Sequence, residues 1–81
     1  MAEYFEEIKR LISDQFGIPG ENIEEDSLLD EDLSITDLDL DDLISLIQKK
    51  YEIEIPQSSI SSFKKISDII SYLYENTEIP E

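Results

Sequence analysis

Apolar residues recur every three to four positions in three segments of this chain, over residues 3–16, 37–51 and 65–75. Polar and mostly acidic residues fill the positions between them. This spacing gathers the apolar side chains on one face of a helix, so each segment is predicted to be an amphipathic helix. The positions predicted to face a core are Phe5, Ile8, Leu11, Ile12, Phe16, Leu40, Leu43, Ile44, Leu46, Ile47, Ile66, Ile69, Ile70 and Leu73.

Local signals predict where these helices begin and end. Gly17 follows the first helix as a stop signal. Thr36 is predicted to be the N-cap of the second helix, and Asp39 stands three residues later, where a capping-box partner belongs.

The connections between the helices also contain apolar residues. Residues 53–55 alternate like a strand but stop at Pro56, so we expect an extended turn there, followed by a short helical segment over 58–62 that presents Ile60. The long first connection, residues 17–36, is expected to lie pinned across the core rather than to be a free linker. Its apolar residues are Ile18, Ile23, Leu28, Leu29 and Leu33.

These segments together predict an all-α fold, a three-to-four-helix bundle with a long first loop. The 81 residues are expected to form a single domain over 1–81, with a core at 3–75 and a frayed tail at 76–81. No apolar run approaches the roughly 18 residues of a membrane span, and the acidic first residues differ from a secretory signal. We therefore expect a monomeric, cytoplasmic protein.

The composition argues against catalysis and against a dedicated metal site. The chain has no His and no Cys, so the usual pairs of nucleophile and base are missing. The acidic run over residues 37–42 superficially resembles a calcium loop. It has Asp42 where such a loop needs its glycine, and Gln48 where it needs the bidentate glutamate. The sequence predicts a protein that is not an enzyme and has no metal site.

The net charge of −15 restricts the choice of partner. Such a field repels nucleic acid phosphates and anionic lipid headgroups, and it speeds encounters with basic protein surfaces. The predicted partner is therefore a basic-surfaced protein or enzyme, not a nucleic acid or a membrane. Solubility alone remains the other explanation for the charge. The six basic residues come as the pairs Lys9-Arg10, Lys49-Lys50 and Lys64-Lys65.

Four stretches between Ile8 and Leu73 resemble, in register, the acyl carrier proteins. They are residues 15–18 (Gln-Phe-Gly-Ile), 26–33 (Asp-Ser-Leu-Leu-Asp-Glu-Asp-Leu), 36–56 (from Thr-Asp-Leu to Glu-Ile-Glu-Ile-Pro) and 65–73 (Lys-Ile-Ser-Asp-Ile-Ile-Ser-Tyr-Leu). The resemblance implies the helical bundle of that family and a setting in lipid or polyketide metabolism. It also implies a serine, within Asp-Ser-Leu, that receives a 4′-phosphopantetheine arm.

Asp37 stands at the position of that serine, because the three residues read Thr36-Asp37-Leu38. A carboxylate cannot serve as the hydroxyl acceptor, so no 4′-phosphopantetheine is expected at this position. Ser34, three residues earlier, is the alternative acceptor. Helix-end chemistry would also explain Asp37, because a carboxylate in the first turn interacts favourably with the helix dipole.

The resemblance also assigns a partner-binding surface, since the second helix is the main docking element of the family. Two of its apolar contact positions are here Asp41 and Ser45, and Lys49-Lys50 stands where acids are usual. The predicted function is an acyl-carrier-like acidic docking module without the arm. The alternatives are a specialised true carrier loaded at Ser34, and an acidic structural or regulatory bundle. The assigned surface comprises Asp37, Leu38, Asp39, Asp41, Asp42, Ser45, Glu52 and Glu54.

Overall fold

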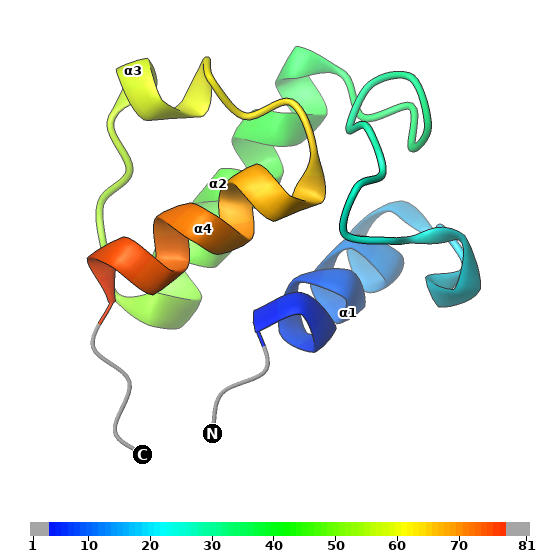
Figure 1. Ribbon diagram of the computed structural model, residues 1–81, viewed down its shortest axis with the longest axis horizontal. Helices are drawn as coiled ribbons and strands as arrows, with labels where there is room; N and C mark the ends of the chain where they lie inside the picture. The colour runs from blue at the N-terminus through cyan, green and yellow to red at the C-terminus, as the bar shows by residue number, and fades with distance from the viewer. Residues whose placement is uncertain (1–3, 78–81) are drawn as a thin grey trace.

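The structure is a computed structural model that describes residues 4–77, and it contains four α-helices and no strand within that range. The all-α bundle with a long first loop is therefore confirmed (Figure 1). No helix in this range is long and apolar enough to cross a membrane. The elements are α1 (Tyr4–Phe16), the 3₁₀ turn η1 (Gly20–Asn22), α2 (Asp37–Tyr51), α3 (Gln57–Ile60) and α4 (Ile66–Asn76).

The three longer helices enclose one apolar core, in which α1 packs against both α2 and α4 (Figure 1). The predicted apolar face of α4 is confirmed, since all four of its predicted residues are buried. In α2, Leu43, Ile44 and Ile47 are buried, whereas Leu40 and Leu46 are half-buried at the edge. The short α3 begins at Gln57, one residue before its predicted start, and buries Ile60 as expected.

The buried face of α1 differs from its prediction. Tyr4 is buried together with Ile8 and Ile12, while Phe5, Leu11 and Phe16 are only half-buried. The Tyr4 ring packs edge-to-face against other aromatic rings that lie far along the chain, those of Tyr51 and Tyr74, at centroid distances of 5.4 and 4.8 Å. Tyr4 and Phe5 both lie at helical spacing from Ile8, four and three residues before it, so spacing permits either ring; these aromatic contacts accompany the burial of Tyr4.

The end of α4 is held by hydrogen bonds. The Thr77 hydroxyl donates to the Leu73 carbonyl at 2.7 Å and also pairs with the Tyr4 hydroxyl. Of the tail predicted at 76–81, Asn76 is thus the last residue of α4 and Thr77 is bonded to the bundle, while residues 78–81 lie outside the described range.

Helix α2 has a capping box at its start and a residue in the left-handed conformation at its end. The predicted capping box at its start is confirmed: Asp39 N–H donates to Thr36 Oγ1 at 3.2 Å, and Thr36 N–H donates to Asp39 Oδ2 at 3.3 Å. At the other end Glu52 takes a left-handed conformation, with φ 56° and ψ 48°. Gly17 ends α1 in the same region, with φ 70°, which glycine adopts without steric cost.

The long first loop is pinned across the core, as predicted. The Leu29 N–H donates to the Lys64 carbonyl at 2.9 Å, just before α4. The loop carbonyls of Ser27 and Glu25 accept from the first two N–H groups of α4, which have no partner within their own helix. Apolar residues of the loop also pack into the core. Of the five predicted, Ile18 and Leu28 are only half-buried. Ile35 is buried although it was not predicted. The buried apolar residues of the loop are Ile23, Leu29, Leu33 and Ile35.

Candidate functional site

Asp37 is the first residue of α2, and its side chain is exposed. It directly follows the Thr36 cap, so its carboxylate lies at the end of the helix where backbone N–H groups point outward. A negative charge there is stabilised by about 0.3–1 kcal/mol through the helix dipole. The position singled out by sequence is therefore accessible and electrostatically suited to an anion.

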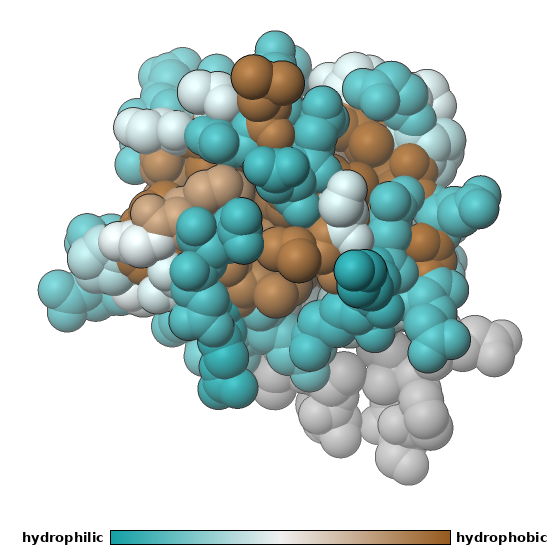
Figure 2. Space-filling model, turned by 180° about the vertical axis from the view of Figure 1, so that it is seen from behind, coloured by the Kyte–Doolittle hydropathy of each residue, from teal (hydrophilic) through white to brown (hydrophobic). Residues whose placement is uncertain are grey.

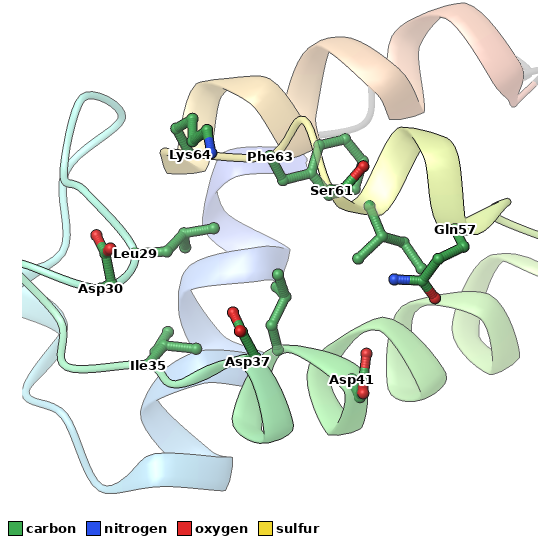
Figure 3. Close-up of a pocket in the computed structure, with 11 residues that line it drawn as sticks. Leu29, Asp30, Ile35, Asp37, Asp41, Gln57, Ser61, Phe63 and Lys64 are labelled. Atoms are coloured by element: carbon green, nitrogen blue, oxygen red, sulfur yellow. The ribbon is translucent and has the colours of Figure 1, made fainter.

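A cavity of about 400 Å³ opens beside Asp37 (Figure 3). Figure 3 shows Asp37 and Asp41 rising from α2 on one side of it, while Gln57 extends its amide from α3 on the other. The long loop and the segment between α3 and α4 close the remaining walls. The lining residues are Leu29, Asp30, Ile35, Asp37, Leu40, Asp41, Gln57, Ile60, Ser61, Phe63 and Lys64.

The cavity wall carries excess negative charge. Three carboxylates, those of Asp30, Asp37 and Asp41, line it together with a single ammonium group, that of Lys64. The ion pair found among residues 4–77 joins Lys9 to Glu6 on α1, away from this wall. None of the three carboxylates is thus neutralised by an ion pair within the described residues. No group of three or more acidic side chains there is arranged to hold a metal ion.

The residues assigned to partner docking are accessible along α2 and just beyond it. Leu38 is 78% exposed, an unusual environment for a leucine. Asp39 is half-buried and engaged in the capping box, so its role in the structure is to begin the helix. The other assigned residues are exposed. Figure 2 shows one face of the molecule, on which hydrophilic side chains interrupt the apolar surface. These exposed residues are Asp37, Asp41, Asp42, Ser45, Glu52 and Glu54.

Ser34 and Thr36, the hydroxyls nearest to Asp37 in sequence, have different environments. Thr36 Oγ1 is occupied as the acceptor of the helix cap. Ser34 is exposed in the loop before α2, at φ 58°, and its N–H donates to the Asp30 carbonyl at 3.1 Å. Position 34 therefore demands a left-handed backbone, which glycine accommodates more easily than serine.

Comparison with known proteins gives this helical arrangement a family. Residues 6–73 match the family model described as "Phosphopantetheine attachment site". The chain belongs to the acyl carrier protein family. Relatives named "Acyl carrier protein" include one from Clostridium perfringens, 31% identical over 74 residues, covering 91% of this chain and 97% of the relative. Another, from Onion yellows phytoplasma, is 34% identical over 73 residues, covering 90% and 96%. A third, from Campylobacter jejuni subsp. doylei, is 32% identical over 69 residues, covering 85% and 90%.

Acyl carrier proteins are carriers and not enzymes, which agrees with the prediction of a non-catalytic protein. The family description implies a 4′-phosphopantetheine group, and Asp37, which the sequence register predicts at the attachment position, does not fit it. Attachment requires a hydroxyl oxygen to form a phosphodiester, whereas Asp37 offers a carboxylate at the start of α2. The phosphodiester that holds such an arm cannot form at Asp37.

Sequence reasoning missed one wall of the cavity. Gln57, Ser61, Phe63 and Lys64 approach the cavity beside Asp37 because the α3–α4 segment lies across that cavity from α2. The segment has no periodic apolar pattern that would have indicated this approach. The sequence predicted one relevant feature of this segment, the burial of Ile60, which packs α3 against the core.

Proposed function

We propose that this member of the acyl carrier protein family is an acidic docking module that binds a basic-surfaced partner protein and bears no 4′-phosphopantetheine. The observation that carries the proposal is Asp37, an exposed carboxylate at the first residue of α2, in the register of the attachment serine. Docking and loading are separable in this proposal, because docking uses the exposed surface at and just beyond α2 and does not need a hydroxyl at position 37.

A carboxylate at this position preserves part of what a loaded carrier would present. Asp37 supplies one negative charge near the helix N-terminus, as a phosphodiester would. An arginine of the partner could form a charge-assisted hydrogen bond with it in a fixed orientation. The charge therefore supports recognition at the same end of α2 without a covalent arm.

The charge along α2 also defines which partner surface would fit. Asp37, Asp41 and Asp42 make the first half of the exposed face acidic, and Lys49-Lys50 makes its end basic. A matching surface is basic opposite the first half and neutral or acidic opposite the second half. The charge pattern of such a partner surface differs from that of a partner that binds a uniformly acidic helix, which would be basic along its whole length.

Intact-mass measurement tests whether an arm is added. The purified protein is incubated with coenzyme A and a promiscuous phosphopantetheinyl transferase, alongside an acyl carrier protein that retains Asp-Ser-Leu. The mass of this protein should stay unchanged while the control gains one arm. A gain on this chain would refute the proposal, and peptide mapping would then identify the modified residue.

A true carrier loaded at Ser34 is the second candidate. It is favoured by the relatives, which are named acyl carrier proteins, and by the exposure of Ser34 in the loop before α2. This candidate predicts a mass gain that maps to Ser34 and disappears in Ser34→Gly. An acidic structural or regulatory bundle, the third possibility, predicts neither a mass gain nor a requirement for the α2 face in binding any basic partner.

A further inference from the structure

The cavity beside Asp37 has an apolar floor that belongs to the core. Leu29, Ile35, Ile60 and Phe63 line it, and they are 3%, 4%, 9% and 7% exposed. Leu40, half-buried at the edge of α2, completes the floor. A group placed in this cavity would thus touch apolar carbon on its inner side.

The rim of the cavity has the opposite character. Asp37 and Asp41 lie one helical turn apart on α2, and Asp30 adds a third carboxylate from the loop. Lys64 offsets only part of this charge. An occupant that combines an apolar body with a positive charge matches both floor and rim, whereas a carboxylate-bearing occupant would be repelled by the rim.

The position of the cavity is compatible with a partner protein that covers α2. It opens along the side of α2, next to the exposed face that presents Leu38 and Asp42. Its volume of about 400 Å³ lies in the range of pockets that hold compact ligands. That volume accommodates a bulky side chain, and the rest of the partner would continue over α2.

We propose that this cavity anchors an apolar side chain of the basic partner protein, while a neighbouring arginine or lysine of that partner meets Asp37 and Asp41. The inference rests on the docking function proposed above and specifies its point of attachment. The anchor side chain is buried at the centre of the contact, where most binding energy in protein interfaces is concentrated.

The chemistry of the site can be tested with n-hexylguanidinium, which joins an apolar chain to the cation of arginine. Titration into the ¹⁵N-labelled protein should shift the amide resonances of Leu29, Ile35 and Phe63, with a Kd in the millimolar range. Hexanol should bind about two- to fivefold more weakly, as expected for loss of an exposed charge pair. Hexanoate should produce no shifts at these amides, and added salt should weaken the binding of hexylguanidinium.

Two matched pairs of variants localise the binding. Ser61 and Ser62 are both exposed and both donate to backbone carbonyls, but only Ser61 lines this cavity. Ser61→Phe should abolish the shifts and Ser62→Phe should retain them. Asp41→Asn should weaken binding about two- to fivefold, and Glu31→Gln, which removes an exposed charge outside the lining, should leave it unchanged. The amide spectrum of each variant reports directly whether it is folded.

The outcomes separate this inference from the function on which it rests. Equal binding of hexanol and hexylguanidinium, or equal effects of the members of either pair, would overturn the anchor site. Such a result would not contradict the proposed docking function, provided that the intact mass still shows no arm. A mass gain with transferase would instead refute the absence of the arm, whatever the cavity binds.

Discussion

The Tyr51 hydroxyl donates a hydrogen bond to the Glu7 carboxylate and thereby ties the end of α2 to the start of α1. The two residues are 44 positions apart, so the bond closes a long stretch of chain. The Tyr51 ring also packs edge-to-face on Tyr4. Burial raises the pKa of Tyr51 above its ordinary value of 10.0, and the Glu7 carboxylate raises it further because it favours the protonated hydroxyl.

This raised pKa predicts a loss of stability in alkali. Below pH 10 both folded and unfolded forms keep the Tyr51 proton, so its contribution is complete. Above pH 10 the unfolded form releases the proton first, and the free energy of unfolding falls as pH rises toward the higher folded pKa. Because Tyr51 is only half-buried, the slope should stay well under the limit of about 1.4 kcal/mol per pH unit.

Tyr51→Phe should reveal this contribution in urea unfolding. At pH 8 the variant should lose about 1 kcal/mol, as expected for one hydrogen bond to a charged group that is partly exposed to water. Between pH 10 and pH 12 its free energy of unfolding should fall less steeply than that of the natural protein. Tyr74→Phe, at a 59% exposed position, should keep the original slope. Identical slopes for Tyr51→Phe and the natural protein would disprove the assignment.

Ser34→Gly should stabilise the protein and remove the alternative acceptor at the same time. Serine at φ 58° is strained relative to glycine, so the free energy of unfolding should rise by about 0.5–1 kcal/mol. Ser62→Gly changes an exposed serine that lacks a positive φ and should bring no gain. Urea unfolding of both variants checks this, and a destabilised Ser34→Gly would contradict the strain argument.

Glu52 provides a second test of backbone strain, at the end of α2. Glu52→Gly relieves the left-handed conformation at φ 56° and should raise the free energy of unfolding by about 0.5–1 kcal/mol. Glu52→Gln removes the charge and keeps the strain, so it separates the two effects. If Gln stabilises as much as Gly, charge repulsion and not backbone conformation dominates at this position.

Most of the helical framework could be predicted because its signals are local. The Thr36–Asp39 cap and the periodic isoleucines of α4 lie within a few residues of the features that they determine. Tyr4 could not be chosen over Phe5 in this way, since its burial depends on Tyr51 and Tyr74. Contacts between residues far apart in sequence decide such cases.

The candidate site was also only partly predictable from the sequence, for the same reason. The assignment of Asp37 to the attachment position is a prediction from motif register, made by counting from residues 32–33 on one side and 52–56 on the other. The cavity beside it could not be found, because Gln57, Ser61 and Lys64 belong to a segment whose path over α2 has no sequence pattern. The Leu29 N–H to Lys64 carbonyl bond that closes one wall also joins distant parts of the chain.

The electrostatic balance of the chain predicts stabilisation by salt. With a net charge of −15 and a single ion pair among residues 4–77, the repulsion between carboxylates of the folded protein is offset by little positive charge. Screening reduces this repulsion more in the compact state than in the expanded one. The melting temperature should therefore rise with NaCl and, at equal ionic strength, rise further with MgCl₂. A melting temperature that falls on addition of either salt would contradict this account.

Introducing the family's attachment motif tests two parts of the proposal: that Asp37 stands where the acceptor serine would be, and that the α2 face differs from that of a carrier. Asp37→Ser should cost well under 1 kcal/mol, because only part of a helix-dipole interaction is lost at an exposed site. In the transferase assay this single change should permit slow loading with one arm. Adding Thr36→Asp should speed the loading, and aspartate is also a good N-cap, so α2 should still begin at the same residue.

Two further substitutions complete the series by changing the exposed face of α2. Asp41→Val and Ser45→Met place apolar residues at the two predicted contact positions, and both positions are exposed, so neither change should disturb the core. Rapid, complete loading of Asp37→Ser alone would mean that the face still suits carrier enzymes and that the acceptor is the one missing part. Loading that improves stepwise with the other changes would indicate a face adapted to a different partner. Failure to load even with all four changes, in a protein with unchanged helical content, would favour the acidic structural bundle over any descendant of a working carrier.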